Sequence, residues 1–362
     1  MNYKKLKVLV STLLLLSNFG YCQHIYEDQK TFHQSFKVAP KANVQVSNKY
    51  GNVHFIIWDK DSVRFEVEMM VKASKPEKVK KIKEFVSFDF SGSQNYLIGQ
   101  TSFNSSSLWT DVATMANTLF STGTSVNISY YVYLPADCNI KVINKFGNVY
   151  MNNHHGSLEA NISNGDLKAG DIDGDLKLNL QFGNTSIGNI KNGRISLEFA
   201  ELNLEKSESL IIDSRSSRIE VKEVDLLDLT SRRDKIYITK VNTITGQTNF
   251  TNLNLKFLNE QIILNAKYGD LSFDNIGRGF KLINITSLYS QITLFFERPT
   301  SFQFDILNHK TDLRLPIEYK QDKQATGVNN GEVRIVGNTG NPNAISKLRL
   351  NNVYGRVNLY ER

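Results

Sequence analysis

Three consecutive units of equal length decide the fold of this chain: ELNLEKSESLIIDSRSS (201–217), RIEVKEVDLLDLTSRRD (218–234) and KIYITKVNTITGQTNFT (235–251). Each unit opens with alternating polar and apolar residues and alternates again in its second half. Alternation with a period of two is typical of a strand that buries one face. A fixed period as short as this predicts a solenoid of stacked units.

The same pattern extends to both sides of these units. Nine landmark residues define four positions each: seven and five residues before the landmark, and two and four after it. Of these 36 positions 33 are apolar, whereas a hydrophobic content of 40% would give about 14. The landmarks are Gly147, Gly165, Gly183, Ala200, Ser217, Asp234, Thr251, Gly269 and Ser290. The position after each landmark is always polar, so this row is expected to face water.

A repeat unit this short cannot include a crossover helix, so successive units can pair only as parallel coils. The sequence therefore predicts an all-β protein, a parallel β-solenoid (β-helix) of 17–18-residue coils with two strands each. The units of a leucine-rich-repeat horseshoe are longer and carry a helical segment, which excludes that solenoid. Glycine at a landmark predicts a turn with positive φ. The same frame recurs around Gly51, Thr311 and Gly355.

Residues 60–127 interrupt the repeat with a different pattern. Alternation from Ser62 to Val71 predicts a strand, and the capping box from Ser74 to Glu77 predicts the start of a short helix. A hairpin over 88–103 and amphipathic turns over 108–119 are expected to follow. We interpret this insertion as a small α+β cap over the open strand edge of the solenoid, with partner binding as the alternative role.

The expected organisation of the chain has four parts. A signal peptide covers 1–22, the N-terminal strands and the first coil cover 23–59, and the cap covers 60–127. The solenoid covers 128–362, and a stretch rich in Asn, Gly and Gln predicts a loop at 320–345.

The N-terminal segment 1–22 predicts export. Three lysines precede an apolar run over 8–16, and Gly20 and Cys22 occupy positions −3 and −1 of a cleavage site before Gln23. We therefore expect a chain exported through the inner membrane and located in the periplasm, at the outer membrane or outside the cell. Lipidation of Cys22 is the alternative, although Tyr21 does not fit a lipidation motif.

The composition of the mature chain excludes several classes. Loss of three lysines lowers the formal net charge from +7 to +4, which is too mild and dispersed to indicate nucleic-acid binding. No other segment is long and apolar enough to be transmembrane. Only Cys138 is left, so an internal disulfide is excluded.

Motifs for metal, cofactor or catalytic chemistry are weak. His154 and His155 adjoin in a turn that we expect to be solvated. The three aspartates in 170–175 lack the spacing of an EF-hand and the glycine pattern of calcium-binding β-rolls, so a plain turn is expected. No phosphate loop, nucleophile elbow or metalloprotease helix occurs. We therefore expect no cofactor, no metal and no catalytic residues.

The candidate ligand-binding residues form a basic ridge: Arg215, Arg218, Arg232, Arg233 and Lys235. Arg215 and Arg232 are one repeat unit apart, as are Arg218 and Lys235, so each pair is expected to lie on adjacent coils. The ridge is either a solvated face of mixed charge or an anion-binding patch for acidic polysaccharide. A carbohydrate-active enzyme similar to a polysaccharide lyase is the alternative, although no general base accompanies the ridge.

A resemblance to a known family agrees with these expectations. The segment NKYGNV (48–53) is repeated as NKFGNV (144–149), and YVYLP (131–135) precedes the second copy. Together with the signal peptide and the insertion, these motifs resemble the putative-adhesin β-strand-repeat family of Gram-negative bacteria, a domain family of unknown function. The resemblance implies an exported, non-catalytic β-solenoid with an adhesin-like role as a surface or envelope binder or scaffold. Its partner would be an anionic polysaccharide or another envelope or surface protein.

Overall fold

The computed structural model describes residues 25–103, 123–325 and 331–362. The predicted signal peptide with Cys22 and the amphipathic turns predicted for 108–119 lie outside these residues. The elements, in chain order, are β1 (Tyr26–Lys37), β2 (Asn43–Lys49), β3 (Val53–Ile57), β4 (Ser62–Ala73), α2 (Pro76–Phe85), β5 (Val86–Ser93), β6 (Tyr96–Phe103), β7 (Ser125–Leu134), β8 (Asn139–Lys145), β9 (Val149–Met151), β10 (Leu158–Ser163), β11 (Leu167–Ala169), β12 (Leu176–Gln181), β13 (Asn184–Glu198), β14 (Glu201–Arg215), β15 (Arg218–Arg232), β16 (Lys235–Asn249), β17 (Asn252–Lys267), β18 (Asp270–Ile276), β19 (Leu282–Phe296), β20 (Phe302–Arg314), β21 (Lys320–Ala325), β22 (Glu332–Thr339) and β23 (Lys347–Glu361).

The chain divides into two compact units, and the segment predicted as a cap contributes to both. Unit 1 comprises residues 1–31, 68–87 and 102–127, and unit 2 comprises 32–67, 88–101 and 128–362. Unit 1 contains the predicted helix, α2, which buries Val79 and Ile82. Lys75 is the N-cap and makes no side-chain cap bond, so the capping box predicted from Ser74 is wrong.

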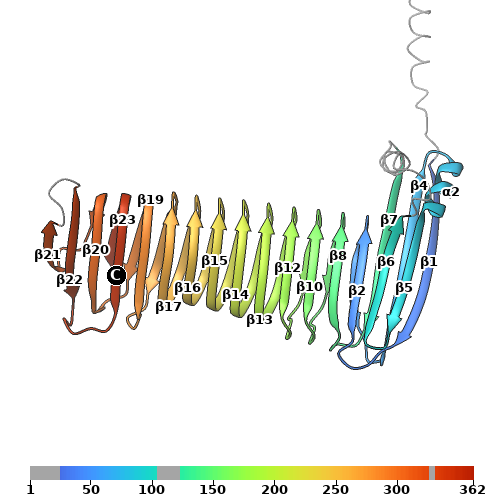
Figure 1. Ribbon diagram of the computed structural model, residues 1–362, viewed down its shortest axis with the longest axis horizontal. Coiled ribbons are helices and arrows are strands. Elements are labelled where there is room, and N and C mark those ends of the chain that lie inside the picture. Colours follow the sequence, from blue (N-terminus) through green and yellow to red (C-terminus); the bar gives the residue numbers. More distant parts are fainter. Residues whose placement is uncertain (1–24, 104–122, 326–330) are drawn as a thin grey trace, which may run out of the picture. The chain divides into compact units, whose positions relative to one another are not determined.

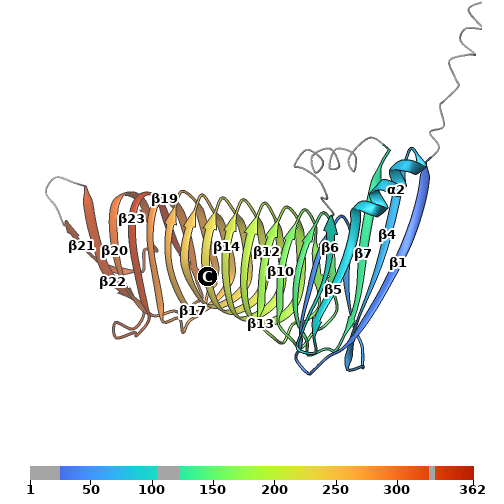
Figure 2. The ribbon, with the colours of Figure 1, turned by 45° about the vertical axis from the view of Figure 1, so that its right-hand side comes forward.

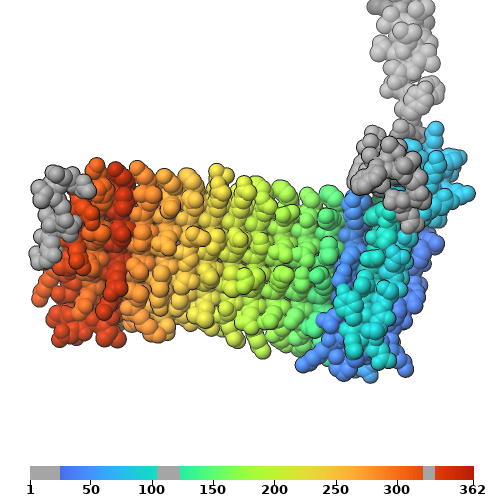
Figure 3. Space-filling model, in the orientation of Figure 1, coloured from blue at the N-terminus to red at the C-terminus, as the bar shows by residue number. Residues whose placement is uncertain are grey.

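Unit 2 confirms the all-β prediction, with a long and mostly parallel sheet. Figure 1 shows β8 to β19 side by side in chain order, and the turned view shows that the strands curve and fold back (Figure 2). Paired residues are 18 apart between β8 and β10, as for Ile140 and Leu158. They are 17 apart between β14 and β15, as for Leu210 and Leu227. We call each such layer of the sheet a rung. On the face shown in Figure 3, the side chains of successive rungs form a continuous surface.

The aliphatic rows predicted from the sequence form the core of unit 2, where Leu210, Leu227 and Ile244 are at most 2% exposed. From β13 to β16 each rung is one 15-residue strand. Two further inward rows were not predicted. One lies seven positions after the landmarks and consists of His154, Ile172, Ile190, Ser207, Val224, Val241, Leu258 and Ile276. The other lies three positions before them and mixes aliphatic residues with buried Ser, Thr and Asn.

The turn at each landmark differs from the prediction. The residue with positive φ is the one before the landmark, for example Phe182 at 55° and Phe199 at 50°. Gly147, Gly165 and Gly183 have no positive φ. Glycine is required there for a different reason: a Cβ on Gly165 would lie 2.0 Å from the carbonyl oxygen of Gly147 on the preceding rung.

The C-terminal rungs do not stack in chain order. Strand β23 pairs in parallel with both β19 and β20, so it lies between them (Figure 1). Strand β22 then pairs antiparallel with β20 and with β21. The loop predicted at 320–345 is therefore wrong, because this segment contains two strands. An antiparallel hairpin on β20 occupies a strand edge that would otherwise be open for pairing.

Candidate functional site

The basic ridge lies at two successive corners, where β14 ends and β15 begins and where β15 ends and β16 begins. The register pairs Arg215 with Arg232 and Arg218 with Lys235. All five ridge residues are exposed. The repeat spacing therefore places these side chains on neighbouring rungs, as expected from the sequence.

The charges of two ridge residues are partly balanced by acidic neighbours. Arg218 donates from Nε (2.9 Å) and from a terminal nitrogen (2.5 Å) to one oxygen of Glu220, which raises the pKa of Arg218. Its guanidinium also lies 4.8 Å from the ring centre of Tyr237. Arg215 lies 3.7 Å from Glu198.

The other three ridge residues keep their charge available. Within the described residues, the side chains of Arg232, Arg233 and Lys235 make no ion pair. A cation without an acidic partner can bind an anionic ligand without first giving up an existing contact. These three residues are therefore the strongest anion-binding candidates of the ridge.

A shallow groove of about 620 Å³ runs beside the ridge, and we call it the corner groove. Its floor is formed by the landmarks Gly183, Ala200 and Ser217. One wall consists of the polar row after the landmarks and the other of the positive-φ row before them. The wall residues are Asn184, Glu201, Arg218 and Lys235 on one side and Phe199, Ser216 and Arg233 on the other. A second hollow of about 560 Å³ has the same construction further along the rungs, around Tyr268 and Tyr289.

The positive-φ row is rich in exposed aromatic residues, and we call it the aromatic row. Its members are Tyr50, Phe146, Asn164, Phe182, Phe199, Ser216, Arg233, Phe250, Tyr268, Tyr289, Lys310 and Tyr354. Neighbouring rings stack face to face: Phe182 and Phe199 are 5.3 Å apart and inclined by 4°. Phe250, Tyr268 and Tyr289 continue in the same way, with centroid distances of 4.8 and 5.4 Å.

The aromatic row has an energetic cost as well as a gain. A non-glycine residue in the left-handed region costs about 1–2 kcal/mol, and a stacked pair returns about 0.5–1.5 kcal/mol. Our sequence analysis missed this row. A recurring aromatic residue directly before the landmark was the signal that could have revealed it.

A buried carboxylate underlies the ridge. Asp234 is 2% exposed and accepts four hydrogen bonds. The donors are the hydroxyls of Ser214 (2.5 Å) and Ser231 (2.6 Å) and the backbone amides of Ser217 (2.7 Å) and Arg232 (3.0 Å). With its oxygens occupied by protein donors, this carboxylate fixes the corner beneath the ridge.

Of the two adjacent histidines, His154 differs from the expectation of a solvated turn, whereas His155 agrees with it. His154 is 1% exposed, and its Nε2 lies 2.6 Å from the carbonyl oxygen of Cys138. Burial lowers the pKa of His154. His155 is exposed and contacts Asp173. No group of three or more His, Cys, Asp and Glu side chains in the described part of the chain is arranged to hold a metal ion.

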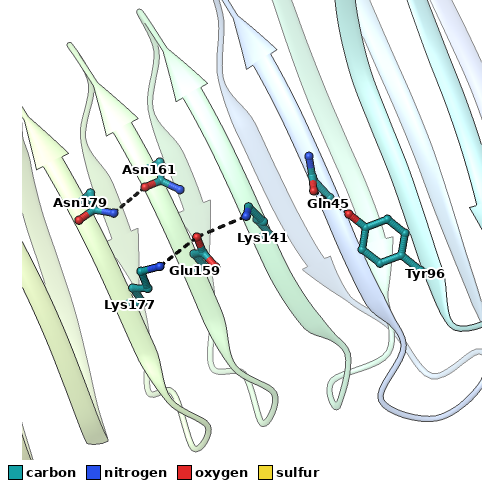
Figure 4. A network of polar contacts seen from close by, with 7 residues as sticks. All are labelled: Gln45, Tyr96, Lys141, Glu159, Asn161, Lys177 and Asn179. Carbon is teal, nitrogen blue, oxygen red and sulfur yellow. Dashed lines mark hydrogen bonds and ion pairs between the residues drawn. The ribbon is translucent and has the colours of Figure 1, made fainter.

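A second polar surface crosses rungs β8, β10 and β12 (Figure 4). Glu159 lies 3.4 Å from both Lys141 and Lys177, and Asn179 donates to Asn161 at 2.6 Å. Burial acts to raise the pKa of Glu159, but the two lysines outweigh it and the pKa is lowered. Because these charges pair with one another, this surface is a weaker candidate for ligand binding than the corner groove.

No protein-family model and no curated protein matches the chain. Among solved structures, a putative cell adhesion protein from Clostridium sporogenes is 8% identical, with 92% of this chain and 100% of that chain covered and a TM-score of 0.17. A putative adhesin from Parabacteroides distasonis is 13% identical over 73% and 92% of the two chains, with a TM-score of 0.27. A putative lipid binding protein from the same species is 9% identical over 90% and 96%, with a TM-score of 0.25. At these TM-scores the likenesses carry no weight for the function, which must be inferred from the chain's own residues.

Proposed function

We propose that the chain is an exported, non-catalytic β-solenoid with 17–18-residue coils that binds acidic polysaccharide in a surface or envelope role. The observation that carries the proposal is that two exposed cations, Arg233 and Lys235, line an open groove, with the exposed Arg232 next to Arg233 in the chain. Arginine recognises carboxylate and sulfate groups through paired hydrogen bonds. A groove that is open along the rungs accommodates an extended chain rather than a small molecule.

Export is part of the proposal and rests on the signal-peptide pattern of residues 1–22. Within the described residues, no helix has the length and apolar character needed to cross a membrane. Cell fractionation combined with protease treatment of intact cells would place the protein in the periplasm or on the surface. Recovery in the cytoplasmic fraction would contradict export.

The anion-binding role is tested with Arg232→Ala/Lys235→Ala, which removes two unpaired cations. We expect affinity for polygalacturonate to fall about tenfold or more, because exposed charge–charge contacts are lost. Wild-type binding should also weaken with added salt, since screening acts over about 8 Å at physiological ionic strength. Titration calorimetry at two salt concentrations measures both effects.

The matched control is Lys168→Ala/Lys191→Ala, which removes the same charge from exposed lysines outside the ridge. Its affinity should equal that of the wild type. If both double variants lose affinity for polygalacturonate equally, binding depends on the net charge of the protein and not on the ridge. Turnover of the polysaccharide that disappears in the ridge variant would instead support the polysaccharide-lyase alternative.

A further inference from the structure

The aromatic row is interrupted beside the ridge. Phe182 and Phe199 form a stacked pair, and stacking resumes at Phe250. Ser216 and Arg233 occupy the two rungs between them. Three rung steps separate Phe199 from Phe250, about 14 Å at the usual strand spacing.

The interruption leaves Phe199 and Phe250, one on each side of the gap, with a single stacked ring neighbour each in the described part of the chain. Inside a stack each ring covers the faces of its neighbours, so only edges reach solvent. Phe199 is the last ring of its stack: Phe182 covers one face, and in the described part of the chain no ring lies against the other. Phe199 is an exposed residue and lines the corner groove.

The open face and the ridge border the same groove. Phe199, Ser216 and Arg233 form one wall of the corner groove, and Arg218 and Lys235 belong to the other. A ligand ring placed over Ser216 would continue the stack at the spacing of one rung and lie next to unpaired cations. A uronate sugar combines an apolar C–H ring face with a carboxylate at the ring edge.

We infer that the gap at Ser216 is a sugar subsite for one uronate residue of an acidic polysaccharide. The inference rests on the proposed function and specifies its ligand. The C–H face of the pyranose lies on Phe199, and the carboxylate binds Arg233 and Lys235. The ring hydroxyls donate to acceptors such as Glu201 on the opposite wall. Successive sugars continue along the open groove.

Filling the gap tests the subsite without changing any charge. Ser216 already has the backbone conformation, φ 53°, in which Phe182 and Phe250 place their rings. In Ser216→Phe the new ring should stack on Phe199 and occupy the sugar's position. We expect the affinity for a galacturonate hexasaccharide to fall about tenfold or more, because the ring contact is replaced. The affinity for polyglutamate, a polyanion without sugar rings, should be unchanged.

A second gap provides the matched control. Asn164 interrupts the row between Phe146 and Phe182 with the same backbone conformation, φ 56°, but away from the ridge. In both Asn164→Phe and Ser216→Phe the new ring can stack on its neighbours, so both variants should have a raised melting temperature. Asn164→Phe should leave hexasaccharide binding intact. If Ser216→Phe folds poorly, Phe199→Leu removes the ring and keeps a comparable apolar volume. Weaker hexasaccharide binding by Phe199→Leu then supports the subsite.

The outcomes separate the two proposals. If Ser216→Phe, or Phe199→Leu in its place, binds the hexasaccharide as the wild type does while Arg232→Ala/Lys235→Ala does not, the sugar subsite is wrong and the anion-binding role stands. If Asn164→Phe loses binding equally, the gap at Ser216 has no special role. If the wild type binds neither polygalacturonate nor the galacturonate hexasaccharide, the proposed function itself fails.

Discussion

Each rung of unit 2 turns a corner at its landmark residue, and these corners are built in two ways. On the rungs of Gly147, Gly165 and Gly183 the landmark is glycine. An added Cβ would lie 2.0 Å from the carbonyl oxygen of the glycine at the same place on the preceding rung. From Ala200 to Thr251 the landmarks carry side chains, and all of these are buried. The backbone of these rungs therefore leaves room for a side chain that points into the core.

The two constructions are stabilised differently. The glycine rungs depend on close backbone approach, and at Gly147 the buried Asn144 side chain donates to the carbonyl oxygens of Gly51 and Gly147. The other rungs bury Asp234 with its hydroxyl and amide donors. A shared repeat thus permits a corner closed by glycine and a corner that buries a carboxylate, which we call the polar corner, and the polar corner lies beneath the basic ridge.

The largest effect is expected for Asp234→Ala. Four donors would lose their acceptor, two of them buried serine hydroxyls, and each unsatisfied group costs about 1–3 kcal/mol. We expect the free energy of unfolding to fall by about 3–5 kcal/mol in urea titration. Asp228→Ala, at an exposed position of the adjoining strand β15, should change it by less than about 0.5 kcal/mol. Similar losses in the two variants would contradict the polar corner.

The glycine corner is tested by Gly165→Ala. The new methyl group would contact the backbone of Gly147, which cannot move aside as a side chain would, so we expect a loss of about 2–3 kcal/mol. The reverse change, Ala200→Gly, should cost only about 0.5–1 kcal/mol through backbone entropy. If both changes cost the same in thermal unfolding, the two corners do not differ in the way we describe.

The smallest effect depends on pH and belongs to the glycine rungs. Burial lowers the pKa of His154 in the folded chain, so below about pH 6.5 the unfolded chain binds a proton that the folded chain does not. Stability should therefore fall as the pH is lowered, by up to about 1.4 kcal/mol per pH unit from this group.

Comparing His154→Leu with the wild type at pH 7.5 and pH 5 isolates this contribution. The variant should lose less stability on acidification than the wild type. An unchanged pH dependence in His154→Leu would show that the buried ring does not titrate in this window.

The sequence predicted part of the candidate site. It placed Arg215 opposite Arg232 and Arg218 opposite Lys235, because a constant repeat length aligns their rungs. It could not show that Arg218 pairs with Glu220 within its own strand. Glu201 on the adjacent strand is an equally plausible partner from the repeat spacing alone. It also missed the groove, because that required knowing that Phe199 points outward while Ala200 points inward.

By itself the sequence determined the repeating strands from β8 to β19, their register and the aliphatic rows defined by the landmarks, but not β21 and β22, where it predicted a loop. Alternation and a constant repeat are local properties, and one-residue slips would expose every apolar side chain of a strand. Only the tertiary structure decided the order of the last strands, because β23 lies between β19 and β20 and pairing between segments far apart in the chain leaves no periodic trace in the sequence. The burial of His154 belongs to a periodic row that our sequence analysis overlooked. The need for glycine at Gly165 follows from the close approach of the Gly147 backbone, which alternation of polar and apolar residues does not reveal.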